Sequence, residues 1–142
     1  MAATGTTLPA WELPLTPTLI VSTAIATRDF QDVHHDRDLA QGHGSKDIFM
    51  NILTTTGYVQ KYVGDWAREA VGPNFRITSC GLRLGAPAYP YDTLAFSGTV
   101  VDNADDAPAG TVTIDVVGVV SLGNHVNAKV TLVVNEQSGA AQ

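Results

Sequence analysis

The hydrophobic positions between Ser45 and Ala67 recur at intervals of three or four residues, and this spacing predicts one long helix. Ser45 is a suitable N-cap, and Asp47 in the first turn would interact favourably with the positive end of the helix. Gly57 lies near the middle and costs about 1 kcal/mol relative to alanine, so we expect another segment of backbone to pack closely there. The apolar stripe consists of Ile48, Phe49, Ile52, Leu53, Thr56, Val59, Val63, Trp66 and Ala67.

After Pro73 the apolar and polar residues alternate, and this period of two is typical of β-strands. The pair Gly123-Asn124 predicts a two-residue hairpin turn between the last two strands, and residues 102–110 predict a polar loop. In the final stretch one face is apolar, with Val126, Ala128, Val130, Leu132 and Val134. The predicted strands, which we expect to form an antiparallel meander, are Phe75–Leu84, Thr93–Val101, Thr111–Ser121 and His125–Asn135.

The residues before the long helix lack a sustained period. Residues 1–17 contain three prolines, and we expect an irregular lead-in there. Residues 18–26 are apolar and rich in β-branched side chains, which predicts a first strand. Residues 28–45 crowd acidic, basic and histidine side chains together, which indicates a loop with short helical turns. At the other end, residues 136–142 predict a frayed tail.

One strand, a loop, a long helix and four further strands predict an α+β domain in which a five-stranded antiparallel sheet wraps a central helix. This layout is typical of the hotdog fold, and we place the domain at residues 18–135. Such a sheet commonly leaves an edge strand that a second chain has to cover. The length of 142 residues and the hydrophobic share of 44% are sufficient for one domain with its own core.

Composition and charge argue against several classes of protein. Charged residues make up 15% of the chain, too few for a disordered protein, and no apolar run approaches the roughly 20 residues of a transmembrane helix. The formal net charge is −6 and Lys and Arg form no cluster, which argues against binding to nucleic acid or to an anionic membrane. Cys80 is the single cysteine, so an internal disulfide is impossible. With no signal peptide expected at the start, these features favour the cytoplasm.

The chemistry is expected in the crowded segment before the long helix, where Asp29 and His34 are separated by four residues. A carboxylate can accept a proton from a water molecule that an imidazole orients, which is what adding water to an activated alkene, or removing it, requires. Spacing of this kind also occurs by chance. A capped turn and a hydrogen-bonded core histidine would account for the same two residues without any chemistry.

The surroundings of these residues resemble a known family. The segment is similar to the motif D-x-N-P-x-H-x-D of the MaoC-like, R-specific enoyl-CoA hydratases, and residues 84–92 resemble the later P-V-x-x-G-D element of that family. Three separated segments also resemble, in order and spacing, the small hotdog subunit of the bacterial steroid side-chain enoyl-CoA hydratase. They are TRDFQDVHHDRD, GSKDIFMNILTTTGYVQKYV and GLRLGAPAYPYDT. The residues that match the motif are Asp29, Asp32, Val33, His34 and Asp36.

The resemblance implies roles for three residues. Asp29 would be the base that activates water, His34 its partner on the same water, and the backbone N–H of Asn51 would hold the thioester oxygen as negative charge develops. The substrate would be an enoyl-CoA with a steroid side chain of cholesterol type, and CoA would be part of that substrate rather than a cofactor. A second hotdog chain would complete the enzyme, as a heterodimer or a dimer of heterodimers.

This chain departs from the motif at Asp32 and Val33, where the family has Asn-Pro. A second carboxylate near Asp29 would raise the pKa of one of the two acids. Alternatively, Asp32 would point away into a helix cap.

Two other functions remain open at this point. A hotdog acyl-CoA thioesterase would use Asp47 or Asp29 as its base and would release a free thiol. A non-catalytic hotdog subunit would only complete the site of a partner chain.

Neither a metal nor the phosphates of CoA have an evident site in the sequence. We expect no metal, because no Glu or Cys completes a ligand set around the neighbouring residues His34, His35, Asp36 and His43. The cations that could meet phosphates form no cluster, which favours a partner chain as the main source of the CoA site. These cations are Arg28, Arg37, Lys46, Arg76 and Arg83.

Overall fold

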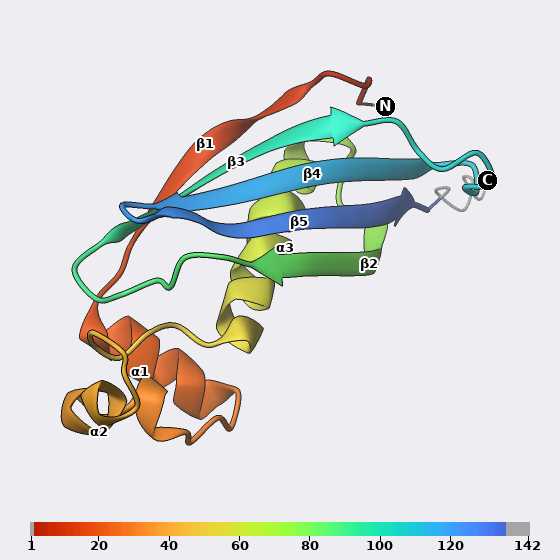
Figure 1. The fold of residues 1–142 in the computed structure, drawn as a ribbon. Coiled ribbons are helices and arrows are strands. Elements are labelled where there is room, and N and C mark those ends of the chain that lie inside the picture. Colours follow the sequence, from red (N-terminus) through yellow and green to blue (C-terminus); the bar gives the residue numbers. More distant parts are fainter. Residues whose placement is uncertain (1, 136–142) are drawn as a thin grey trace.

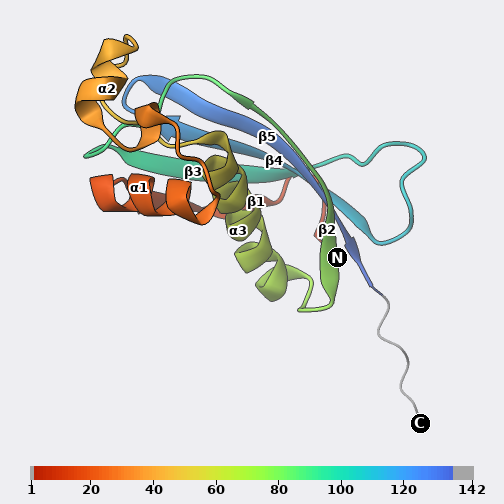
Figure 2. The ribbon, with the colours of Figure 1, turned by 90° about the horizontal axis from the view of Figure 1, so that it is seen from below.

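The structure, a computed structural model, describes residues 2–135. Its five strands form one antiparallel sheet in the order β1-β3-β4-β5-β2, and this sheet curves around the long helix α3 (Figure 1). Figure 2 shows that α1 and α3 lie on the same side of the sheet. The strands are β1 (Thr7–Pro14), β2 (Phe75–Leu84), β3 (Thr93–Val101), β4 (Thr111–Val120) and β5 (Gly123–Val134). The helices are α1 (Pro17–Ala26), the 3₁₀ turn η1 (Asp32–His34), α2 (Arg37–Gly42) and α3 (Ile52–Ala70). The predicted α+β class, with a sheet wrapped around a central helix, is confirmed.

The alternating pattern after Pro73 forms the strands that it predicts. Alternate residues of β5 are buried in the core, namely Val126, Ala128, Val130 and Leu132. Strands β3, β4 and β5 form a meander, but β2 pairs with β5, with Leu84 opposite Val126. The prediction of a meander of four consecutive strands is therefore wrong for β2. Helix α3 crosses the sheet before β2 begins, and this crossing carries β2 to the edge opposite β1 (Figure 1).

Helix α3 begins at Ile52 and its N-cap is Asn51, six residues after the expected N-cap Ser45, because residues 45–51 form bonds elsewhere. The N–H of Phe49 donates to Val33 O at 3.1 Å and the N–H of Met50 donates to Ala88 O at 3.0 Å, so this stretch is not helical. The expectation of close backbone packing at Gly57 is not met within the described chain. Apart from the adjacent residues and the backbone of the same helix, no atom of the described residues lies within 4 Å of the position that a Cβ would take there.

The N-terminal part of the chain differs most from the predictions. The irregular lead-in expected for residues 1–17 contains β1, which pairs with β3 at the sheet edge, with Leu13 opposite Leu94. Its prolines are compatible with a strand because an edge strand needs bonds on one side only. The strand expected at residues 18–26 is helix α1. Thr16 caps it by accepting from the N–H of Leu19 at 3.0 Å, and Pro17 occupies the first helical position, so these start signals outweigh the β-branched composition.

The β4–β5 turn consists of Ser121 and Leu122, not of Gly123-Asn124 as predicted, because Gly123 already pairs with Val120. The carboxylate of Asp92 fixes this turn by accepting from the N–H and the hydroxyl of Ser121, at 3.1 and 2.6 Å. The loop expected at residues 102–110 is confirmed, whereas the tail expected at 136–142 lies outside the described residues. Across residues 2–135, no helix combines the length and the apolarity needed to cross a bilayer.

Candidate active site

Asp29 lies directly after helix α1, where the chain turns sharply. Arg28 has a left-handed backbone conformation, with a φ of 56°, and the N–H of Asp29 donates to Ala24 O at 2.8 Å. Left-handed residues commonly end helices, although a side chain with a Cβ makes this conformation costly. The turn therefore fixes Asp29 beside the C-terminal end of α1, and the predicted loop with short helical turns follows it.

His34 is the last residue of η1, and its ring is almost fully buried. Its Nδ1 lies 2.6 Å from Phe49 O, and since a carbonyl can only accept, Nδ1 carries a hydrogen. In the neutral ring this leaves the lone pair on Nε2, which lies 3.3 Å from Oδ2 of Asp29. The sequence spacing thus does bring Asp29 and His34 together.

Asn51 is the N-cap of α3 and connects three segments of the site. Its Oδ1 accepts from the N–H of Thr54 at 3.0 Å, while its Nδ2 donates to Thr27 Oγ1 at 2.9 Å and to Asp29 Oδ2 at 3.1 Å. The backbone N–H of Asn51 makes no hydrogen bond within the described residues. It lies at the start of a 19-residue helix, where the helix dipole favours negative charge.

The pKa of Asp29 lies below its ordinary value. Partial burial acts to raise the pKa, but the hydrogen bonds donated by the Asn51 amide and by the N–H of Gln31, at 3.1 and 3.2 Å, lower it. The positive charge that His34 and His35 carry when they are protonated lowers the pKa of Asp29 further. Asp29 is therefore a carboxylate at neutral pH, able to accept a proton.

Asp32, where the motif has Asn, does not raise the pKa of Asp29. Its carboxylate lies 3.8 Å from Nε2 of exposed His43, and it caps no helix, so neither predicted role applies. Asp36 caps α2 by accepting from Leu39 N–H at 3.0 Å. His35 supports the backbone of Asp29, because its Nε2 donates to Asp29 O at 2.6 Å.

Asp29, His34 and Asn51 border one pocket of about 440 Å³. One wall comes from the residues after α1, a second from the start of α3, and a third from the chain that leaves β2. The lining residues are Asp29, Gln31, His34, Phe49, Met50, Asn51, Ile52, Leu84, Gly85, Ala86, Pro87 and His125. The pocket thus combines the candidate base, its histidine and the candidate N–H donor.

His125 is a pocket residue that the sequence analysis did not single out. Its Nδ1 donates to Ala86 O at 2.7 Å and its Nε2 lies 2.8 Å from Thr55 Oγ1. Burial lowers the pKa of His125, so the ring is neutral at physiological pH, although the bond to Ala86 acts in the opposite direction. In a regular strand, successive side chains point to opposite faces, so His125 would be exposed if Val126 is buried. The pairing of β4 with β5 is irregular between Gly118 and Val119, and this leaves both His125 and Val126 buried.

Other candidates lie away from the pocket. Asp47, the alternative thioesterase base, accepts from the N–H of Ile48 at 2.7 Å and lines a separate hollow beside Tyr89. Among the described residues, no three His, Cys, Asp or Glu side chains are placed to hold a metal ion.

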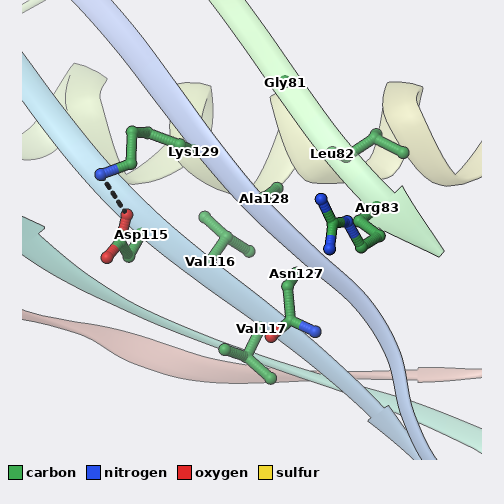
Figure 3. A pocket seen from close by; sticks show the side chains of 9 residues that line it. All are labelled: Gly81, Leu82, Arg83, Asp115, Val116, Val117, Asn127, Ala128 and Lys129. Atoms are coloured by element: carbon green, nitrogen blue, oxygen red, sulfur yellow. Dashed lines mark ion pairs between the residues drawn. The ribbon is translucent and has the colours of Figure 1, made fainter. Parts of the chain in front are cut away.

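The pocket lining includes neither lysine nor arginine. Arg83 is next to Leu84 of the lining, but it lies on the outer face of the sheet, in a shallow hollow that also contains the Asp115–Lys129 ion pair (Figure 3). The Nζ of Lys46 lies 5.5 Å from the centre of the Tyr89 ring, and Lys46 does not line this pocket. None of the predicted cation candidates therefore borders this pocket.

The chain is similar to several known proteins. Over 132 residues, 93% of this chain and 96% of the relative, the chain is 58% identical to the beta subunit of the 3-oxo-4,17-pregnadiene-20-carboxyl-CoA hydratase of Mycobacterium tuberculosis. A chain of the ChsH1–ChsH2 complex of the same organism superposes with a TM-score of 0.85 at 56% identity, over 95% of this chain and 100% of that one. This chain belongs to the MaoC-like hotdog hydratases.

The resemblance stated from the sequence is thereby confirmed, both for the MaoC-like hydratases and for the hotdog fold. The (R)-hydratase from A. caviae involved in PHA biosynthesis has a TM-score of 0.77 at 12% identity, over 94% of this chain and 98% of its own, and shows the shared fold alone. No protein-family model matches the chain.

Proposed function

We propose that this chain is a subunit of an enoyl-CoA hydratase, a hydro-lyase that adds water across the 2,3-double bond of an enoyl-CoA thioester. We further propose that the acyl group is a steroid side chain of cholesterol type, since the relative at 58% identity is a hydratase of a pregnadiene-carboxyl-CoA. The observation that carries the proposal is the pair of Asp29 Oδ2 and His34 Nε2, 3.3 Å apart in one pocket.

In the proposed mechanism, one water molecule bridges Asp29 and His34. The carboxylate accepts one hydrogen of the water, and the lone pair on His34 Nε2 accepts the other, so a lone pair of the water oxygen is directed at C3 of the substrate. As the O–C3 bond forms, the proton passes to Asp29 and the electrons of the double bond move onto the thioester oxygen. Asp29 then returns the proton to C2, so that hydroxyl and hydrogen both come from the same water.

We assign stabilisation of the enolate oxygen to the backbone N–H of Asn51. This N–H has no partner within the described residues and lies at the start of α3. A donor that is already in place when charge develops lowers the barrier, and loss of one such donor typically reduces the rate by about 10²–10³-fold. The side chain of Asn51 holds Asp29 at the same time, so one residue connects the base to the oxyanion donor.

We also propose that a second hotdog chain completes the site, in a heterodimer or a dimer of heterodimers. The pocket lining has no cation for the CoA phosphates. Three large apolar side chains next to the site are exposed, with Phe30 at 68%, Ile52 at 50% and Leu53 at 54%, and a partner surface would cover them. The single cysteine supports a cytoplasmic location for this complex.

The test uses the chain co-purified with the hotdog chain of its genomic neighbourhood, and a steroid enoyl-CoA as substrate. We expect loss of the enoyl-thioester absorbance without release of free thiol. Asp29→Asn should lower kcat by about 10²–10⁴-fold, the usual contribution of a general base, and leave the melting temperature unchanged. The matched control is Asp32→Asn. The carboxylate of Asp32 is close to His43 rather than to the pocket, so this variant should retain activity.

Each other outcome points to a different function. Release of free thiol would identify a thioesterase. Full activity of the Asp29→Asn complex would mean that the partner carries out the reaction and that this chain only completes the fold.

A further inference from the structure

His125 joins two walls of the pocket that are far apart in the sequence. Its Nδ1 donates to the carbonyl of Ala86, in the segment that leaves β2, and its Nε2 meets the hydroxyl of Thr55, in the first turn of α3. His125 and Thr55 are both essentially inaccessible, with exposures of 2% and 0%. Water therefore does not compete for these two hydrogen bonds.

The direction of each bond is fixed by chemistry. The carbonyl of Ala86 can only accept, so Nδ1 of His125 carries the hydrogen and Nε2 of the neutral ring is an acceptor. The hydroxyl of Thr55 therefore donates to Nε2 at 2.8 Å. The carbonyl of Asn51 lies farther from this hydroxyl, at 3.4 Å, so the hydroxyl proton belongs to the bond with His125.

Both ends of this bridge lead to the proposed oxyanion donor. On the helix side, the N–H of Thr55 donates to Asn51 O at 3.2 Å. On the other side, the segment that contains Ala86 continues to Ala88, whose carbonyl accepts from the N–H of Met50, the residue before Asn51, at 3.0 Å. The bridge thus spans the part of the pocket in which the thioester would be held.

We infer that His125 and Thr55 are a pair of positioning residues for the hydration reaction, which hold the Asn51 N–H at a fixed distance from the opposite wall formed by residues 84–87. This inference rests on the proposed function. Neither residue exchanges a proton with the substrate. Their effect is on the geometry of the oxyanion donor, and misplacement by about 1 Å can reduce a rate by about 10²-fold.

The experiment measures kcat and KM in the complete complex for variants that break one bond each. Thr55→Val removes the hydroxyl at nearly constant shape, and Thr55→Ser keeps it. His125→Asn retains an N–H at the Nδ1 position for Ala86 but loses the acceptor for Thr55. We expect Thr55→Val and His125→Asn to lower kcat by about 10–10²-fold with little change in KM, and Thr55→Ser to be close to the wild type. The double variant should be no worse than the more impaired single variant, because both break the same bond.

The outcomes separate this inference from the function on which it rests. If Asp29→Asn abolishes activity while Thr55→Val and His125→Asn keep full kcat and only melt at lower temperature, the pair is structural and the inference is wrong. The inference also fails if Thr55→Ser is as impaired as Thr55→Val, since the hydroxyl would then not matter. Full activity of Asp29→Asn would overturn the proposed function, and the inference with it.

Discussion

The strands β3 to β5 and the segment between β1 and α3 differ in the regularity of the bonds that hold them in place. The strands combine an extended backbone ladder with buried apolar side chains such as Phe96, Ile114 and Leu132. The segment that carries Asp29 also buries apolar side chains such as Ile20, but its turns are fixed by single hydrogen bonds, for example from His34 Nδ1 to Phe49 O. Each such bond contributes about 1 kcal/mol to stability, but each also fixes the direction of a reactive group. The regular strands therefore supply most of the core, whereas most of the proposed catalytic groups lie on turns before α3.

The largest effect that would separate the two regions is expected at Gly118 in β4. A Cβ at this position would lie 2.8 Å from Val126 Cγ1 and 3.0 Å from Leu94 Cδ1, both in the core. We expect Gly118→Val to lower the free energy of unfolding by about 2–3 kcal/mol, measured by urea unfolding, because the core has no room for the added atoms.

The matched control is Gly81→Val in β2, where a Cβ would meet no atom within 4 Å. This variant should retain the stability of the wild type. If both variants lose the same free energy of unfolding, the loss in Gly118→Val does not come from a lack of space in the core.

A second, intermediate effect is expected on the pH dependence of the reaction. In the wild type, burial raises the pKa of Asp29, but the Asn51 amide and the other donors outweigh it, and the pKa is below the ordinary value. Asn51→Asp replaces a donor by a second carboxylate, which favours the protonated form of the acid pair. Since the base must be ionised, we expect the acidic limb of kcat/KM to move up by about 1–2 pH units.

Asn127→Asp adds the same charge on the outer face of the sheet and should leave the pH profile unchanged. An unchanged profile in Asn51→Asp as well would contradict the assignment of Asp29 as the base. The new carboxylate can still accept from the N–H of Thr54, so the cap of α3 should be preserved.

The smallest effect is expected at Gly57 in α3. Because nothing within the described chain occupies the Cβ position, Gly57→Ala should stabilise the chain by about 0.5–1 kcal/mol in urea unfolding. The control Gly72→Ala makes the same exchange at a φ of +89°, where alanine is strained, and should destabilise the chain. If Gly57→Ala instead weakens binding of the partner chain, the partner contacts α3 at this glycine.

The sequence predicts the sheet better than the segment before α3, for a physical reason. Burial of one face imposes a period of two along the strands, and this period is visible in β5 from Val126 to Leu132. Between Thr16 and Asn51, single capping side chains decide the structure. Thr16 and Pro17 start a helix in residues rich in β-branched side chains, and Asn51 starts α3 although Ser45 is also a suitable cap. Which cap is used depends on tertiary bonds such as that between Met50 and Ala88.

The candidate site shows the same division. The motif predicts that Asp29 and His34 are neighbours, and the structure places them 3.3 Å apart. No local pattern points to His125, because its partners Ala86 and Thr55 are 39 and 70 residues away. A buried histidine at a strand irregularity becomes recognisable only when the pairing of β4 with β5 is known.

The short distance between Oδ2 of Asp29 and Nε2 of His34 also has a stereochemical consequence. Two groups that hold one water molecule present it to a single face of a planar double bond. In the proposed mechanism the proton that reaches C2 comes from that same water, so both new bonds form on that face. In the proposed mechanism the addition is therefore syn, and the geometry of one carboxylate and one imidazole fixes the configuration at C2 relative to that at C3.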